Sequence, residues 1–264
     1  MDILRPASRR QQEIVSLVRE TGRVSVEELV ARFGVTPQTI RRDLNDLSEA
    51  RLITRTHGGA VVASGVENLA YEARKLVAQS NKRRIGEAAA KLVPDHSSLF
   101  INLGTTTEEV AQALTGHTGL LVITNNINVA NFLYRNSSIS VVIAGGTIRP
   151  TDGGVVGQMA ADIIRQFKVD LAIIGTSAID EDGTLLDYDV REVQVSRAII
   201  ENARQVVLVT DQTKFSRRAP VRIARLDEIH TLVTDKLPSK MTEIFQRLGI
   251  VVIETGGEIE DEPD

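Results

Sequence analysis

A nine-residue segment that begins at Thr36, T-P-Q-T-I-R-R-D-L, limits what the N-terminal part of this chain can fold into. Thr36 is a favoured helix N-cap, and Pro37 suits the first helical position because the N–H it lacks would be unpaired there anyway. Ile40 and Leu44 fall on one face at helical spacing. The other faces carry side chains that can reach base edges and phosphates in a major groove: Gln38, Thr39, Arg41, Arg42 and Asn45. The segment predicts a recognition helix, and an ordinary amphipathic surface helix is the alternative.

Two shorter helices are expected before this segment. The first follows the capping-box pair Ser8 and Gln11, and the second follows the pair Ser25 and Glu28. The second helix should stop near Gly34, where a tight turn leads into the third. Two helices joined by a short glycine turn, with Arg and Gln facing outward, are typical of a helix-turn-helix.

A β-hairpin is expected after the third helix. β-branched runs flank the triplet His57-Gly58-Gly59, as in a hairpin with a tight turn. This wing would bring Arg55, Thr56 and His57 close to a phosphate backbone or a minor groove. The chain has 4 His and no Cys, so a tip contact or plain exposure of His57 is favoured over metal ligation.

Composition and charge narrow the class of protein. The absence of cysteine excludes disulfides, zinc fingers and thiol nucleophiles. No signal-peptide pattern and no long apolar run occur, so we expect a cytoplasmic protein. Residues 1–60 carry 10 Arg and no Lys against 8 Asp and Glu, whereas the segment from Glu254 onward carries six carboxylates and no base. A basic N-terminal end and a neutral middle suit a regulator with a small DNA-binding domain.

The second half of the chain alternates short apolar strands with amphipathic helices. The strands are expected over 99–103, 121–124, 140–144, 170–175, 206–210, 231–234 and 250–253. The helices are expected over 82–92, 106–114, 127–135, 157–166, 189–203 and 239–247. Such alternation predicts an α/β fold with a mainly parallel sheet and helices on both faces. Ligands of these sheets bind at the carboxyl ends of the strands.

Polar residues follow several of the expected strands. The loop Gly104-Thr105-Thr106-Thr107 opens a helix, whose free N–H groups and positive dipole end suit a phosphate; a merely capped helix start is the alternative. Asn126 opens another helix. Arg149 lies among glycines, where either an anion site or two ordinary turns would fit. Lys214 follows a later strand and could pair with a phosphate or simply be solvated.

Two acidic residues lie between these loops. Asp189 and Glu192 could hydrogen-bond to sugar or polyol hydroxyls, and Asp189 could equally cap the helix that follows it. The two functions are compatible.

These motifs resemble a known family. The strings V-S-V-E-E-L-V, F-G-V-T-P-Q-T-I-R-R-D-L and R-T-H-G-G-A, between Arg10 and Ala60, resemble the DNA-binding half of DeoR-type bacterial repressors. The second half resembles the DeoR-type sensor domain, which shares its fold with ribose-5-phosphate isomerase and CoA transferases. The strings T-N-N-I-N-V-A-N, A-G-G-T-I-R-P-T-D-G-G-V-V-G and R-A-I-I-E-N-A-R resemble the branch that responds to glycerol 3-phosphate.

The resemblance implies a domain plan and a function. We expect a winged helix-turn-helix over 1–62, a linker over 63–80, a sensor of phosphorylated sugars or polyols over 81–255, and an acidic disordered tail over 256–264. The protein would repress glycerol catabolism genes as a homo-oligomer on double-stranded operator DNA and be released by glycerol 3-phosphate. A repressor that responds to another sugar phosphate is the alternative.

The resemblance also implies the contact residues. DNA would be contacted by Thr36, Gln38, Thr39, Arg41, Arg42, Arg55 and His57. The effector would be bound by Gly104, Thr105, Thr106, Thr107, Asn126, Arg149, Asp189, Glu192 and Lys214. Neither a cofactor, nor a metal, nor a catalytic residue is expected.

A phosphosugar isomerase is the enzymatic alternative, because the fold would be the same. Isomerases of this type carry two carboxylates after the middle strand, where this chain has Gly175-Thr176-Ser177-Ala178. They also use a lysine in the following segment, whereas none occurs between Lys168 and Lys214. Asp187 or Glu192 could still act as a base, but proton abstraction is poorly supported. A repressor is therefore expected rather than an enzyme.

Overall fold

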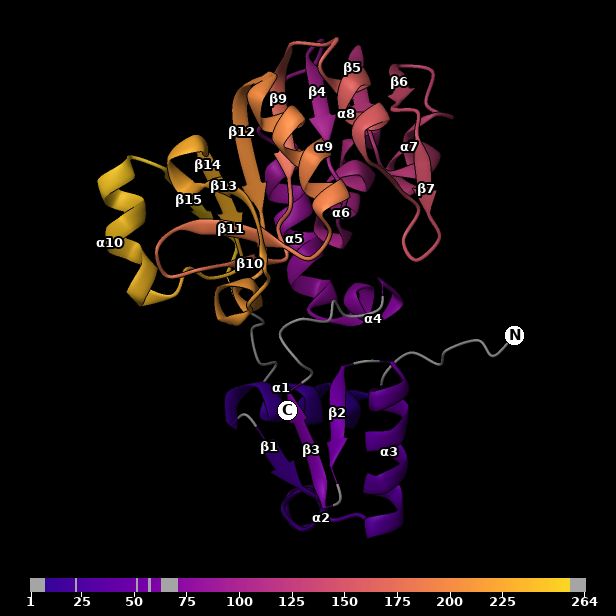
Figure 1. Cartoon of the computed structure of the whole chain (residues 1–264), viewed down its shortest axis with the longest axis vertical. Coiled ribbons are helices and arrows are strands. Elements are labelled where there is room, and N and C mark those ends of the chain that lie inside the picture. Colours follow the sequence, from indigo (N-terminus) through magenta and orange to yellow (C-terminus); the bar gives the residue numbers. More distant parts are fainter. Residues whose placement is uncertain (1–7, 22, 51, 57, 63–70, 257–264) are drawn as a thin grey trace. The chain divides into compact units, whose positions relative to one another are not determined.

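The computed structural model describes residues 8–21, 23–50, 52–56, 58–62 and 71–256 (Figure 1). The chain forms two compact units, Met1–Val77 and Ala78–Asp264. His57, residues 63–70 of the expected linker and residues 257–264 of the expected acidic tail lie outside the described residues. Within those ranges, no helix is long and apolar enough to cross a membrane.

The N-terminal unit combines helices with a small antiparallel sheet, as predicted for a winged helix-turn-helix. Its helices are α1 (Arg9–Thr21), α2 (Val26–Phe33), α3 (Pro37–Glu49) and α4 (Tyr71–Leu76). Its sheet has the order β1 (Arg23–Ser25), β3 (Gly59–Val62), β2 (Ile53–Thr56). Helix α4 lies in the segment expected as linker. The hairpin is formed by β2 and β3, with Thr56 paired to Gly59.

The predicted capping residues start and end the helices. The backbone N–H of Gln11 donates to Ser8 Oγ at 3.2 Å, and that of Ser8 donates to Gln11 Oε1 at 2.9 Å. Ser25 and Glu28 form the same reciprocal pair at α2. Gly34 ends α2 with a φ of 61°, a left-handed conformation that favours glycine. These local hydrogen bonds confirm the predicted helix boundaries.

The core of this unit is formed by the faces predicted to be apolar. Ile14, Leu29, Ile40 and Leu44 are fully buried between the helices and the sheet. One polar contact between these helices was not predicted: Arg10 Nε donates to Asp43 Oδ2 at 2.6 Å. This ion pair ties α1 to the recognition helix, and Asp43 is buried.

Strand β1 was also missed by the sequence analysis. It covers only three residues, and its partner β3 is more than thirty residues later in the chain. The approach is close enough to require a glycine: a Cβ at Gly59 would lie 1.9 Å from the carbonyl oxygen of Val24. Strand β1 thus holds the β2–β3 hairpin on the helices.

The C-terminal unit is built on one parallel sheet. The strand order is β15-β14-β12-β9-β4-β5-β6, and every neighbouring pair is parallel. The strands are β4 (Ser98–Ile101), β5 (Leu120–Thr124), β6 (Ile139–Ile143), β9 (Val169–Ile174), β12 (Ala203–Val209), β14 (Thr231–Thr234) and β15 (Val251–Glu254). Each coincides with an expected strand to within a few residues, which confirms the parallel α/β prediction.

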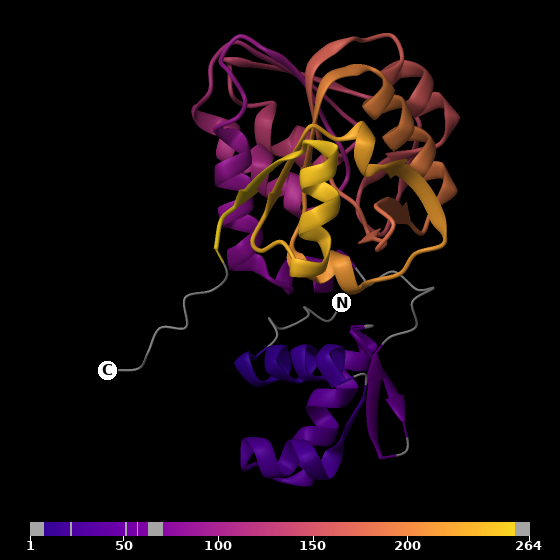
Figure 2. The same cartoon turned by 90° about the vertical axis from the view of Figure 1, so that its left-hand side faces the viewer.

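Helices cover both faces of this sheet (Figures 1 and 2). They are α5 (Gln79–Ala90), α6 (Thr105–Ala113), α7 (Ile127–Leu133), α8 (Gln158–Ile164), α9 (Val190–Glu201) and α10 (Ser239–Leu248). Alternate strand residues point to opposite faces: Ile101 belongs to a buried cluster that includes residues of α5, α6 and α7, whereas Phe100 belongs to one that includes residues of α8, α9 and α10. The buried layers fix the carboxyl ends of the strands at a single edge.

Short antiparallel strands near that edge were not predicted. They are β7 (Thr147–Arg149) with β8 (Gly154–Val156), and β10 (Ala178–Ile179) with β11 (Thr184–Asp187) and β13 (Val221–Arg225). Each has only two to five residues, too few for a clear alternation. Short 3-10 helices complete the unit: η1 (Leu114–Gly116), η2 (Gln212–Ser216) and η3 (Leu226–Glu228).

Candidate DNA-binding and effector sites

Helix α3 presents a polar face. Gln38, Arg41 and Arg42 are exposed, opposite the buried Ile40 and Leu44. The two threonines of the prediction are engaged in capping the helix: Thr39 N–H donates to Thr36 Oγ1 at 3.2 Å, and their hydroxyls lie 2.9 Å apart. Thr36 thus fixes where the helix begins, and the polar side chains of α3 lie on its exposed side.

Arg55 lies on the wing strand β2 and is half-buried. One of its guanidinium nitrogens, Nη1, is buried and makes no hydrogen bond to the residues that the structure describes. A buried donor without a partner is uncommon in native proteins.

The loop before α6 starts the helix at a glycine. Gly104 has φ 147° and ψ 148°, a region that essentially only glycine occupies, and no side chain caps the helix. Thr107 instead takes the structural role that was the alternative: its hydroxyl faces the carbonyls of Asn102 and Gly104, each at 2.8 Å. The first-turn N–H groups of α6 are therefore not capped by a side chain.

Asn126 joins this loop to the next strand end. Its Oδ1 accepts from the N–H of Asn128 at 2.9 Å, so it caps α7, and its Nδ2 donates to Glu108 Oε1 at 3.1 Å. Asn128 Nδ2 donates to the same Glu108 oxygen at 3.0 Å and to the carbonyl of Asp152 at 3.1 Å. The sequence analysis missed Glu108, a buried carboxylate in an otherwise ordinary amphipathic helix.

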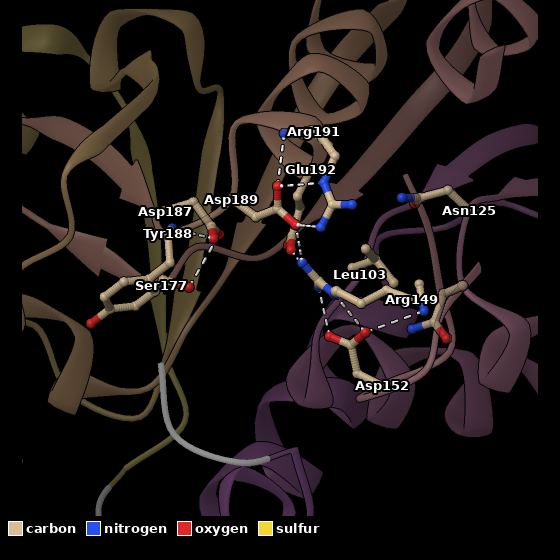
Figure 3. Close-up of polar contacts among 12 residues, drawn as sticks. Leu103, Asn125, Arg149, Asp152, Ser177, Asp187, Tyr188, Asp189, Arg191 and Glu192 are labelled. Carbon is tan, nitrogen blue, oxygen red and sulfur yellow. Dashed lines mark hydrogen bonds and ion pairs between the residues drawn. The ribbon is translucent and has the colours of Figure 1, made fainter. Parts of the chain in front are cut away.

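Arg149 is surrounded by carboxylates (Figure 3). Its Nε and Nη2 donate to both oxygens of Asp152, at 2.9 and 2.7 Å. Nη2 also donates to Glu192 at 2.6 Å, and Nη1 donates to Asp189 at 3.0 Å. Burial alone would lower the pKa of Arg149, but these carboxylates raise it above its ordinary value. Arg149 is thus a permanent cation that orients three carboxylates.

Asp189 caps the following helix, as one of the two suggested functions requires, and also forms ion pairs. It caps α9 by accepting from the N–H of Arg191 at 2.9 Å, and it forms an ion pair with the Arg191 guanidinium at 2.9 Å. Hydrogen bonding from Arg191 and Arg149 outweighs partial burial and lowers its pKa to about 2. The guanidinium groups of Arg149 and Arg191 and the carboxylates of Asp152, Asp189 and Glu192 thus form one connected cluster.

Lys214 belongs to a second group, at the end of β12. It lies in η2, whose first residues are capped by the fully buried Asp211. Burial would raise the pKa of Asp211, but the positive charges of Lys214 and Lys82 bring it down to about 2. Lys82 is in α5 and is itself only 3% exposed. The sequence analysis named Lys214 alone, because residues 82 and 211 are far apart in the chain.

The residues that could serve an isomerase as a base are held in other contacts. Asp187 is buried and accepts from Ser177 Oγ at 3.1 Å and from the N–H of Tyr188 at 2.6 Å (Figure 3). Glu192 is paired with Arg149. Among the described residues, no group of three or more His, Cys, Asp and Glu could hold a metal ion.

A helix-turn-helix with a wing, followed by a parallel α/β unit with polar strand ends, defines a two-unit class of DNA-binding regulator. The chain belongs to the DeoR family of transcriptional regulators. The DeoR-like helix-turn-helix domain matches residues 10–66, and the DeoR C terminal sensor domain matches residues 77–236.

Curated relatives match along both units. The glycerol-3-phosphate regulon repressor of Haemophilus influenzae is 47% identical, over 96% of this chain and 98% of its own length. The protein of the same name from Escherichia coli is 46% identical, over 88% and 92% respectively. The repressor CsqR of Escherichia coli is 41% identical, over 87% and 88%. These relatives are transcriptional repressors rather than enzymes.

Solved structures are similar at the level of the fold. Ribose 5 phosphate isomerase A from Neisseria gonorrhoeae is 14% identical, with a TM-score of 0.38 over 51% of this chain and 52% of that one. RipA from Yersinia pestis is 17% identical, with a TM-score of 0.40 over 58% of this chain and 44% of that one.

Proposed function

We propose that this protein represses genes of glycerol catabolism and leaves its operator when glycerol 3-phosphate binds to the C-terminal unit. The observation that carries the proposal is the identity of 46–47% to two glycerol-3-phosphate regulon repressors, which extends over about nine tenths of the chain. The similarity extends over both units, so it includes the DNA-binding part and the sensing part.

The charges at the strand ends support an orientation for the effector. The cluster around Arg149 brings three carboxylates together, and carboxylate oxygens accept hydrogen bonds from the hydroxyl groups of a polyol. The N-terminus of α6 and Lys214 favour the phosphate. We therefore place the phosphate near Gly104–Thr107 and Lys214, with the glycerol hydroxyls toward Asp189 and Glu192. Asn126 and Arg149 act by holding these carboxylates and loops in position.

Operator DNA is the second ligand. The exposed side of α3 would enter the major groove through Gln38, Arg41 and Arg42, and Arg55 on the wing would follow the backbone. Recognition of a repeated operator requires a homo-oligomer, because symmetric sites need symmetric proteins. The proposal places the protein in the cytoplasm, where operator DNA is accessible.

Another phosphorylated ligand is the second candidate. The putative aga operon transcriptional repressor of Escherichia coli O157:H7 is 28% identical over 94% of this chain, so repressors of this type serve more than one operon. A fixed-salt titration of the operator complex, followed by fluorescence anisotropy, distinguishes the candidates. We expect release by glycerol 3-phosphate and not by fructose 1-phosphate or ribose 5-phosphate. Release by one of the other two would assign a different regulon, and no response to any phosphate would contradict the sensing function.

A further inference from the structure

The C-terminal sheet has two edge strands, β6 and β15 (Figure 1). An edge strand presents unpaired backbone N–H and C=O groups to any second strand, and proteins normally protect it with charges, proline, a bulge or a covering segment. The first three are absent from β6. Its pairing with β5 runs from Ile139 to Ile143 without a bulge, and residues 136–148 contain no charged residue and no proline.

The hydrogen bonds at the two ends of β6 show which of its backbone groups point outward. The C=O of Ser138 accepts from the N–H of Gly119 at 2.8 Å, and the N–H of Ala144 donates to the C=O of Thr124 at 2.8 Å. Even-numbered residues therefore face β5. By alternation, the odd-numbered residues direct their N–H and C=O groups away from it. Among the described residues, none bonds to the outward groups of Val141, at the centre of the strand.

The segment that follows β6 does not cover this edge. A Cβ at Gly146 would lie 3.1 Å from Val155 Cγ1 and 3.5 Å from the backbone nitrogen of Ala160. The β7–β8 hairpin is thus packed against the start of α8, and within the described ranges the only strand beside β6 is β5. Ile143, at the end of β6, is 45% exposed, and Ile148 in β7 is 54% exposed. Apolar side chains therefore remain exposed next to an unpaired edge.

The outward groups of β6 are complementary to those of a second copy of the same strand. If two copies pair antiparallel about a two-fold axis at Val141, the two Val141 residues lie opposite each other and exchange both N–H···O=C bonds. The N–H of Ile143 then faces the C=O of Ile139 in the other copy. The N–H of Ile139 is already used, because it donates to the carbonyl of Asn136 at 3.0 Å. Since the strand carries no charge, the pairing opposes no like charges.

The other edge of the sheet is less suited to a second copy. Strand β15 ends at Glu254, and six carboxylates and no base occur from that residue onward. Antiparallel pairing of two β15 strands would bring these like charges close together, which is unfavourable. The distribution of charge therefore favours β6 over β15 as the edge at which two copies meet.

We propose that β6 is a subunit interface, at which two copies of this chain pair antiparallel about Val141 and join their seven-stranded sheets into one. This inference rests on the proposed function, because recognition of a repeated operator requires a homo-oligomer. It adds the surface through which two copies associate and the register in which they do so.

The test uses the absence of cysteine from the chain. Val141→Cys places one thiol per copy on the two-fold axis, where the two Cα atoms would be about 5.5 Å apart, within the range that a disulfide spans. Ile143→Cys is the matched control, because residue 143 is more exposed but its two copies would be about 14 Å apart. Oxidation should convert most of the Val141→Cys protein into a covalent dimer and leave Ile143→Cys mostly monomeric on a non-reducing gel. Equal cross-linking of the two variants would overturn the pairing.

Two measurements on the parent protein do not depend on a variant. Sedimentation velocity should show a dimer or a larger assembly. In that assembly the amide of Val141 should exchange with solvent as slowly as that of Val142, which faces β5; fast exchange at Val141 alone would overturn the interface. A parent that is monomeric at every concentration would contradict the homo-oligomer of the proposed function together with this inference. An assembled parent whose Val141→Cys variant does not cross-link removes this inference alone.

Discussion

Individual residues in this protein derive their properties from partners that are distant in the sequence. Arg149 illustrates this, because a residue expected to bind an anion is ringed by Asp152, Asp189 and Glu192. Its neighbours turn it into a residue that positions carboxylates. The sequence predicted which loops would meet at the strand ends, but it could not predict which charges would neutralise one another there.

Arg42 tests the DNA-binding face at the level of one side chain. Because it is exposed on α3, Arg42→Ala should leave the fold intact and weaken operator binding by about 1–3 kcal/mol. Fluorescence anisotropy at fixed salt measures this change. Arg165→Ala, an exposed arginine in the other unit that pairs with Asp162, is the matched control. An unaltered operator affinity in Arg42→Ala would remove this residue from the interface.

Asp211 gives a prediction about pH. Its pKa in the folded protein is about 2, below the ordinary value of 3.8, so its ionised form stabilises the fold above that ordinary value. The contribution, roughly 2 kcal/mol from the size of the shift, is lost as the pH falls through about 2. The difference in unfolding free energy between the parent and Asp211→Asn should therefore shrink between pH 5 and pH 2. Urea titrations at several pH values measure it, and a difference independent of pH would contradict the assignment.

At the scale of elements, local sequence patterns were sufficient to predict a helix or strand wherever it is long or capped. The first three helices of the N-terminal unit, with the caps at Ser8, Ser25 and Thr36, follow from short-range spacing. The parallel strands follow from apolar runs. Strand β1 and the antiparallel β10–β11–β13 sheet do not, because each is short and is stabilised by a partner far along the chain. The ion pair of Arg10 with Asp43 was missed for the same reason, because the two residues are far apart in the chain.

The three-stranded wing sheet makes a prediction about glycines. Gly59→Ala would put a Cβ 1.9 Å from the carbonyl of Val24, so β1 and β3 must separate and the unfolding free energy should fall by about 1–3 kcal/mol. Gly58→Ala has no atom within 4 Å of the added Cβ and should change it by less than about 0.5 kcal/mol. Circular dichroism melting of both variants makes the comparison. Equal stability of the two would show that β1 does not hold the hairpin.

At the scale of the whole molecule, function is a coupling between two ligands. The N-terminal unit carries the polar face of α3, and the C-terminal unit carries the strand-end site. Neither unit alone accounts for regulation, which needs each ligand to change the affinity for the other. Sequence patterns identified both units. They could not reveal the buried hydrogen bond between Asn81 and Asp235, because the two residues are far apart in the chain.

Reciprocal titration tests the central claim most directly. The affinity for glycerol 3-phosphate is measured on the free protein and on the operator complex, and the affinity for operator is measured with and without saturating effector, all at one salt concentration. The account predicts that operator weakens effector binding by the same factor by which effector weakens operator binding. Glycerol 3-phosphate that binds with equal affinity to the free protein and to the complex would contradict it.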